Sequence, residues 1–191
     1  MAEKVENRTI PGMHSDLTSV LLTEDEIHRK VAEMGRQIAA DYEGKNPMLV
    51  GILKGAVLFA SDLFRAMSCP ASIDFMAVSS YGASTKSSGV MRILKDLDQG
   101  VEGQHVLLVE DIVDTGLTLR YLREYLEGRG PASLKVAVFL DKPSRRQVPV
   151  QVDYCGFEIP DEFVVGYGLD FAERYRNLPY IGVLKPEMYQ R

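Results

Sequence analysis

Two adjacent acids and a short polar turn lie in the middle of the chain. Glu110 and Asp111 follow an apolar run at residues 106–109, and the turn Asp-Thr-Gly-Leu-Thr occupies residues 114–118. Backbone N–H groups at a helix start, together with threonine hydroxyls and an unhindered glycine, can surround a phosphate. Carboxylates can hold ribose hydroxyls or Mg²⁺, which prefers one or two carboxylates plus substrate oxygens. The stretch therefore predicts a site for a phosphorylated sugar.

The elements around this stretch predict an α/β fold. Residues 106–109 indicate a parallel strand covered on both faces, and leucines at helical spacing after residue 118 indicate a helix that ends near Gly128. Open parallel sheets bind ligands at such strand-to-helix turns. Thr23 and Glu26 form a possible capping box at the start of an earlier helix. The other predicted elements are strands at residues 48–53, 73–78, 134–140 and 163–165 and a helix at residues 56–67. Together they favour a mainly parallel twisted sheet flanked by helices.

Composition narrows the class of protein. The chain has 191 residues without a composition break, which predicts a single domain over 1–191. Its net charge of -5 gives no support for nucleic-acid binding. Cys69 and Cys155 are isolated, so neither a disulfide framework nor a zinc site is indicated, and a cytoplasmic location is expected. No apolar run has membrane-spanning length, and residues 1–16 are typical of a flexible tail rather than a signal peptide.

Taken by residue type alone, the turn would also suit an ordinary strand-to-helix loop with an Asp-Thr cap. The whole string at residues 106–119, however, resembles the phosphoribosyl-pyrophosphate (PRPP) binding motif of type I phosphoribosyltransferases, in its 6-oxopurine (hypoxanthine-guanine) version. The resemblance extends over about residues 22–184. It implies the type I phosphoribosyltransferase fold, with a small hood region and a mobile lid loop. The implied phosphate-binding residues are Asp114, Thr115, Gly116, Leu117 and Thr118, although relatives carry Lys or Asn at the position of Leu117.

A second motif follows the strand predicted at residues 48–53. A lone lysine such as Lys54 is more often a solvated residue at a helix start than a ligand contact. In the family that this chain resembles, however, Leu53-Lys54-Gly55 is the pyrophosphate loop, so Lys54 and Gly55 are implied PRPP contacts. The resemblance also implies a cis peptide bond between Leu53 and Lys54, and it makes Arg176 a pyrophosphate-binding arginine.

Ser80 and Tyr81 open a stretch rich in small polar residues at 82–89. Such a stretch is also compatible with a long connection in a β-hairpin. The resemblance implies instead a lid that closes over PRPP and excludes water, with Ser80 and Tyr81 as pyrophosphate contacts.

Purine-binding residues are implied by two later motifs. The charged run at residues 141–146 would by itself be read as solvated surface. Lys142 matches the family lysine that hydrogen-bonds the purine 6-oxo group. Phe163 matches the aromatic residue that stacks on the purine, and Val164 the residue whose backbone reads the base edge. The resemblance assigns no role to Arg145 or Arg146.

The reaction implied by the resemblance moves the 5-phosphoribosyl group from PRPP to N9 of hypoxanthine or guanine. The products are IMP or GMP and pyrophosphate, and the role is purine salvage. Asp114 is the candidate catalytic general base, and Mg²⁺ is the implied cofactor, with Glu110, Asp111 and Asp170 as its ligands. The expected partners are PRPP, a 6-oxopurine base and further copies of the chain in a homodimer or homotetramer, with neither nucleic acid nor membrane.

Two alternatives stay open at this stage. The first is a regulatory protein that senses PRPP without making nucleotides, although the acidic composition does not favour binding to nucleic acid. The second is a phosphoribosyltransferase with another base preference, such as xanthine, because the sequence does not settle how the purine 2-substituent is read.

Overall fold

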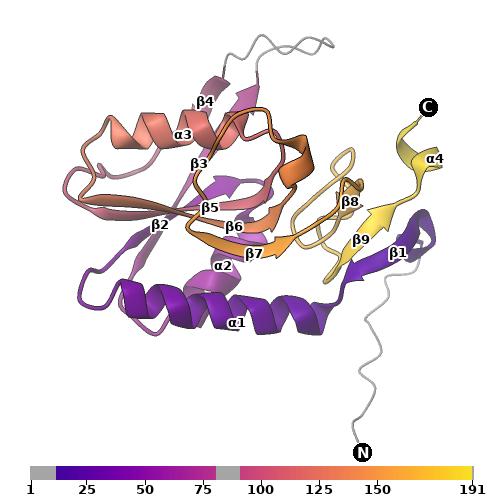
Figure 1. Cartoon of the computed structure of the whole chain (residues 1–191), viewed down its shortest axis with the longest axis horizontal. Helices are drawn as coiled ribbons and strands as arrows, with labels where there is room; N and C mark the ends of the chain where they lie inside the picture. The colour runs from indigo at the N-terminus through magenta and orange to yellow at the C-terminus, as the bar shows by residue number, and fades with distance from the viewer. Residues whose placement is uncertain (1–11, 81–90, 191) are drawn as a thin grey trace, which may run out of the picture.

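A six-stranded sheet forms the centre of the computed structural model, which describes residues 12–80 and 91–190 (Figure 1). The strand order is β4-β3-β2-β5-β6-β7, and every neighbouring pair is parallel except β3 with β4. The strands are β2 (Met48–Leu53), β3 (Ser72–Ser80), β4 (Met91–Lys95), β5 (His105–Val113), β6 (Ser133–Asp141) and β7 (Tyr154–Glu158). The mainly parallel sheet predicted from the sequence is confirmed.

The strand order reverses direction between β2 and β5. From β2 the chain continues outward through β3 to β4, whereas from β5 it continues through β6 to β7 on the other side. Such a reversal leaves a crevice outside the carboxyl ends of the two central strands. The pyrophosphate loop predicted after Leu53 and the phosphate turn predicted after Val113 therefore lie next to each other.

Helices cover both faces of this sheet. α1 (Glu24–Asp41) and α2 (Val57–Ala66) lie on one face and α3 (Leu117–Glu127) on the other (Figure 1). The capping box at the start of α1 is present, since the Glu26 N–H donates to Thr23 Oγ1 and the Thr23 N–H donates to Glu26 Oε2. α2 is one residue shorter at each end than predicted, and α3 ends at Gly128 as predicted.

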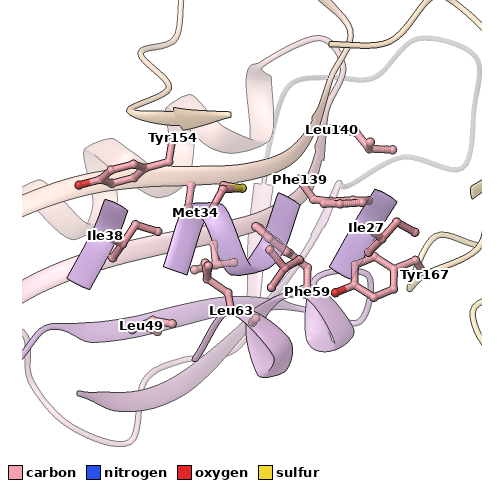
Figure 2. Packing of buried hydrophobic residues seen from close by; sticks show 14 of the residues in the cluster. Ile27, Met34, Ile38, Leu49, Phe59, Leu63, Phe139, Leu140, Tyr154 and Tyr167 are labelled. Atoms are coloured by element: carbon pink, nitrogen blue, oxygen red, sulfur yellow. The ribbon is translucent and has the colours of Figure 1, made fainter. Parts of the chain in front are cut away.

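The apolar core has one cluster on each face of the sheet. Ile27, Met34 and Ile38 of α1 point toward Phe59 and Leu63 of α2 and toward the sheet (Figure 2). On the other face, the leucines of α3 pack on the alternate side chains of β5 and β6. Each fully buried leucine, isoleucine, phenylalanine or methionine side chain contributes about 1.5–3 kcal/mol to folding. Packing on both faces therefore holds the sheet in place beneath the loops at its edge.

A second, three-stranded antiparallel sheet forms the hood. Its strand order is β1-β9-β8, and the strands are β1 (Leu17–Leu22), β9 (Ile181–Leu184) and β8 (Val164–Val165). The hood has its own apolar cluster, which includes Tyr175, Leu178 and Tyr180. A short helix, α4 (Pro186–Tyr189), follows β9.

The hood corrects one prediction about the sheet. Residues 163–165 were expected to contribute a strand to the mainly parallel sheet, but Val164 and Val165 pair with Val183 and Gly182 of β9 in the antiparallel hood. A short apolar run predicts a strand without indicating its partner, and the partner here is distant in sequence. β1, β4, β7 and β9 were not predicted as strands.

Two predicted segments lie partly or wholly outside the described residues. The first is the predicted tail, of which residues 1–11 are not described. The second is the predicted lid, of which Tyr81 and residues 82–89 are not described. Residues 14–16 of the predicted tail instead form a short 3-10 helix, η1 (His14–Asp16), where Asp16 accepts a hydrogen bond of 2.7 Å from the Tyr175 hydroxyl. Within residues 12–80 and 91–190, no helix combines the length and apolar character that a membrane span needs.

Candidate active site

Three adjoining cavities follow the carboxyl edge of the central sheet. The first has a volume of about 410 Å³ and lies between β6 and the hood, the second of about 220 Å³ surrounds the phosphate turn, and the third of about 320 Å³ lies between β2 and β5. Asp114 lines both the first and the second, whereas Glu110 and Thr118 line both the second and the third. The three cavities therefore form one continuous trough.

The phosphate turn lies in the middle of this trough. Gly116 adopts the left-handed conformation with φ 85°, and a side chain there would press on the backbone carbonyl of Val148. The Leu117 N–H is 3.4 Å from Thr115 Oγ1, and the first intrahelical hydrogen bond of α3 runs from the Arg120 N–H to the Gly116 carbonyl. The amides of the first turn before Arg120 have no intrahelical acceptor, as at any helix start. Thr118 and Leu119 of this turn line the second cavity, where free amides could bind an anion.

The predicted pyrophosphate loop lies beside the third cavity. The peptide bond between Leu53 and Lys54 is cis, which confirms the expectation from the resemblance. Gly55 must be a glycine, because a Cβ atom there would overlap the Asp111 carboxylate. The side chain of Lys54 contacts Glu173, with a distance of 3.0 Å between Nζ and Oε2.

Of the two adjacent acids of β5, Glu110 is buried and Asp111 is half-buried. Burial raises the pKa of Glu110 well above its ordinary value, and the nearby negative charge of Asp111 raises it further. Burial also raises the pKa of Asp111 to about 6. Two neighbouring carboxylates with raised pKa values favour a cation between or beside them, and both line the third cavity.

Asp170 and Arg176 lie opposite these acids in a loop of the hood. Arg176 Nη2 is 2.8 Å from Asp170 Oδ1, and Arg176 Nη1 donates to the Gly168 carbonyl at 2.7 Å. Gly168 in turn touches the backbone of Gly55, so that a side chain at Gly168 would overlap the Gly55 carbonyl. The hood loop and the pyrophosphate loop are thus in direct contact. Among the described residues, no three His, Cys, Asp or Glu side chains are grouped closely enough to hold a metal by themselves.

The first cavity combines a buried cation with apolar walls. Lys142 is only 8% exposed, its ammonium donates a hydrogen bond to the Glu162 carbonyl, and burial lowers its pKa. Ile112 and Val164 line the cavity, and Phe163 lines it with a ring that is 37% exposed. A flat heterocycle with a carbonyl group would fit such a cavity, because apolar atoms can cover its faces while the ammonium donates to the carbonyl oxygen.

The family of the chain follows from comparison with known proteins. Residues 19–172 match the model of the phosphoribosyl transferase domain. The chain belongs to the phosphoribosyltransferase family. It is 52% identical to hypoxanthine-guanine phosphoribosyltransferase of Bacillus subtilis over 178 residues, which are 93% of this chain and 99% of that protein. A solved hypoxanthine phosphoribosyltransferase from Staphylococcus aureus superposes with a TM-score of 0.92 at 50% identity and covers 97% of this chain and 100% of its own.

A further relative of this phosphoribosyltransferase is much longer. The bifunctional protein TilS/HprT of Listeria innocua is 54% identical over 178 residues, which are 93% of this chain but 28% of that protein. The chain therefore spans about a quarter of the length of such bifunctional relatives.

The structure of this phosphoribosyltransferase brings most of the predicted site residues together. Lys54, Gly55, Glu110, Asp111, Asp114, Thr115, Gly116, Leu117, Thr118, Lys142, Phe163, Val164, Asp170 and Arg176 all lie on or next to the trough. Ser80 is the last residue of β3, and Tyr81 lies outside the described residues. The predicted contacts of these two residues with pyrophosphate stay predictions.

Three site residues were not found from the sequence. Arg145 is 2.9 Å from the Asp114 carboxylate, Glu173 pairs with Lys54, and Tyr189 lines the first cavity. Arg145 stands in the charged run whose roles the resemblance left open. Glu173 and Tyr189 belong to no motif, and no periodicity or spacing in the chain points to them. Their place in the site depends on contacts between distant segments.

Proposed function

We propose that this phosphoribosyltransferase transfers the 5-phosphoribosyl group of PRPP to N9 of hypoxanthine or guanine, forming IMP or GMP and pyrophosphate. One observation carries the proposal, namely the order of chemical groups along the trough. A buried lysine with apolar walls lies in the first cavity, the phosphate turn lines the second, and Gly55 of the pyrophosphate loop lines the third together with the two acids of β5. A purine, a ribose 5-phosphate and a pyrophosphate would occupy these places in that order. Relatives named hypoxanthine-guanine phosphoribosyltransferase support this assignment.

The purine site would select a 6-oxo group. An ammonium group is a donor only, so Lys142 can donate to a 6-oxo oxygen, whereas a 6-amino group offers it no acceptor. Lys142 already donates to the Glu162 carbonyl, which fixes its side chain inside the cavity. Phe163 would stack on one face of the purine and Ile112 would cover the other, since both line the same cavity.

Stabilisation of the negative charge on the departing pyrophosphate would favour cleavage of its bond to ribose. Attack by purine N9 on the ribose C1 atom breaks the bond to pyrophosphate, whose oxygen takes the electron pair, and positive charge develops on the ribose in between. Lys54 and Arg176 are placed to neutralise the departing pyrophosphate. Glu110 and Asp111 would steady the ribose hydroxyls, and the phosphate turn would hold the 5-phosphate. The substrate is thereby oriented for an effectively unimolecular attack.

The acid pair fits a magnesium ion. Mg²⁺ uses one or two carboxylates together with substrate oxygens, and burial raises the pKa values of Glu110 and Asp111, so a cation beside them would stabilise their charged forms. Asp170 would contribute from the hood, although it pairs with Arg176 in this structure. When bound, Mg²⁺ would neutralise negative charge on the pyrophosphate group of PRPP.

Asp114 is the proposed general base for the purine. It lines both the base cavity and the phosphate cavity, so it lies where the imidazole ring of the purine would meet the ribose. Assistance of this kind contributes about 10²–10⁴ in rate. Arg145 contacts the Asp114 carboxylate at 2.9 Å and orients it. From the family resemblance we also propose a single domain that acts in the cytoplasm as a homodimer or homotetramer.

The test is nucleotide formation from PRPP with hypoxanthine, guanine, xanthine and adenine offered separately, with and without Mg²⁺. Turnover of hypoxanthine or guanine that needs Mg²⁺, and that falls by about 10²–10⁴ in Asp114→Asn, would support the proposal. Turnover of xanthine or adenine alone would contradict the base assignment. PRPP binding without turnover of any base would indicate a PRPP-sensing protein instead.

A further inference from the structure

We propose that Tyr189 is a positioning residue of the purine site, because its ring supports the ring of Phe163 against which the base would stack. This inference rests on the proposed function and extends it to the short helix α4, which contains none of the motifs. Tyr189 lines the same cavity of about 410 Å³ as Lys142 and Phe163, so α4 forms part of the wall of the base site.

The ring geometry indicates a preformed aromatic support. The centroids of Tyr189 and Phe163 are 4.6 Å apart and their planes differ by 18°, which is a stacked arrangement. Phe171 meets Phe163 edge-on, with centroids 5.7 Å apart and planes at 87°. Both contacts lie in the range where aromatic pairs attract each other beyond simple burial. Phe163 is thus held by one ring against its face and another at its edge.

The end of β9 positions both Phe163 and Tyr189. The Leu184 N–H at the end of β9 donates to the Phe163 carbonyl at 2.8 Å, which fixes the backbone of Phe163. α4 begins two residues later, after Lys185, whose N–H donates to the Asp16 carbonyl at 3.0 Å. Met188 and Tyr189 then pack on the apolar cluster of the hood. The distance between the two rings is therefore determined by a short, well-anchored piece of chain.

This support matters because Phe163 is exposed. Phe163 is 37% exposed and precedes a strand of only two residues, so the rotation of its side chain is restricted mainly by Tyr189 and Phe171. A ring that turns freely must lose that freedom when a base stacks on it, which weakens binding. Tyr189 removes this cost in advance by holding the plane of Phe163. The hydroxyl group of Tyr189 plays no part in this argument, which requires only the flat ring.

The experiment compares wild type, Tyr189→Ala and Tyr189→Phe by steady-state kinetics, with KM measured separately for hypoxanthine and for PRPP. We expect Tyr189→Ala to raise KM for hypoxanthine about three- to tenfold, with KM for PRPP nearly unchanged. Tyr189→Phe should behave like wild type because it keeps the ring. An unchanged or lowered KM for hypoxanthine in Tyr189→Ala would overturn the inference, as would an equal rise of both KM values or an equal defect in Tyr189→Phe.

A double-mutant cycle with Phe163→Ala separates support of Phe163 from direct contact with the base. If Tyr189 acts through Phe163, then Tyr189→Ala has little further effect on KM for hypoxanthine once Phe163 is alanine. A full additional effect in that background would overturn the inference. The affinity for GMP, measured by calorimetry, is a second readout in all four proteins, and it should fall in Tyr189→Ala by a similar factor. If the wild type formed no nucleotide, the proposed function would fail, whereas a functional wild type without this coupling would refute the role of Tyr189 alone.

Discussion

Lys54 Nζ donates a hydrogen bond to Glu173 Oε2 at 3.0 Å, so the lysine proposed to meet pyrophosphate is already paired with an acid of the hood. Glu173 stands in a tight turn with φ 60°, and its second carboxylate oxygen is 3.7 Å from Arg176 Nη2. The lowered pKa of Glu173 follows from the hydrogen bond and the charge of Lys54. A pyrophosphate group that binds both cations must displace this carboxylate.

Glu173→Gln is therefore expected to strengthen PRPP binding. Because both side chains are about two-thirds exposed, solvent screens their attraction and the pair is weak. KM for PRPP should fall by up to about fivefold, and the difference from wild type should shrink in high salt because exposed charges are screened. The measurement is KM for PRPP at low and at high ionic strength.

Glu43→Gln is the matched control for this prediction. Glu43 is exposed and follows α1, whose last turn lies near the start of β5 at the opposite edge of the sheet. The two variants change the net charge equally. If Glu43→Gln lowered KM for PRPP as much as Glu173→Gln, the effect would reflect overall charge rather than release of Lys54.

Gly55→Ala should damage both PRPP use and stability. The added Cβ atom would overlap the Asp111 carboxylate, so either the acid or the pyrophosphate loop must move. Overpacking of this kind costs about 1–3 kcal/mol, and we expect kcat/KM for PRPP to fall at least about tenfold. Gly100→Ala is the control, because a Cβ atom there meets nothing within 4 Å. Equal behaviour of the two variants would show that the contact between Gly55 and Asp111 is unimportant.

The lowered pKa of Lys142 predicts an alkaline limit for purine use. Burial is the main cause, so the ammonium loses its proton at a lower pH than an ordinary lysine, whose pKa is about 10.4. As pH rises, Lys142 stops donating to the 6-oxo group and kcat/KM for hypoxanthine falls. Lys142→Arg keeps its charge throughout. The ratio of kcat/KM for hypoxanthine in wild type to that in Lys142→Arg should therefore decrease with rising pH. Ionisation of the free purine affects both proteins equally, so it does not change this ratio. A ratio that stays constant with pH would contradict the role of Lys142.

The contacts of Asp41, which lies far from the site, predict a contribution to the free energy of unfolding that depends on pH. The Tyr154 hydroxyl donates to Asp41 Oδ2 at 2.6 Å and Lys135 Nζ lies 3.0 Å from the same oxygen. These two contacts, in that order, lower the pKa of Asp41. The pKa of Asp41 is lower in the folded protein than in the unfolded chain. The two contacts therefore stabilise the fold fully at pH values above the unfolded pKa, and this stabilisation is lost as pH falls through the folded pKa.

Asp41→Asn should therefore be less stable than wild type at pH 7, by about 1 kcal/mol after allowance for a carboxylate that is 41% exposed. The difference should shrink between about pH 5 and pH 3. Urea unfolding at several pH values measures it. Glu43→Gln serves again as a control, since the described residues form no ion pair with Glu43. A stability loss that is the same at every pH would exclude the charge of Asp41 as its cause.

Local patterns were sufficient to predict the centre of the fold. The apolar run of β5, the capping box of α1 and the boundaries of β2 depend on neighbours within a few residues, and the structure confirms all three. The turn between β5 and α3 also lies where its adjacent glycine and threonines predicted it, whereas its binding of phosphate stays a prediction. The cis bond before Lys54 is also confirmed, but it was expected from the family resemblance rather than from local physics.

The tertiary structure alone decided how the hood meets the sheet. β8 was predicted as a strand, but its pairing with β9 in the hood could not be predicted from a short apolar run. The contacts of Glu173 with Lys54 and of Tyr189 with Phe163 were likewise invisible in the sequence. In each case the partners come from different segments, and only the packing of those segments determines which side chains meet. The sequence by itself thus determined the motifs and the elements that bear them. Folding decided that Glu173 pairs with Lys54 and that Tyr189 stacks on Phe163, because both are contacts between segments distant in the chain.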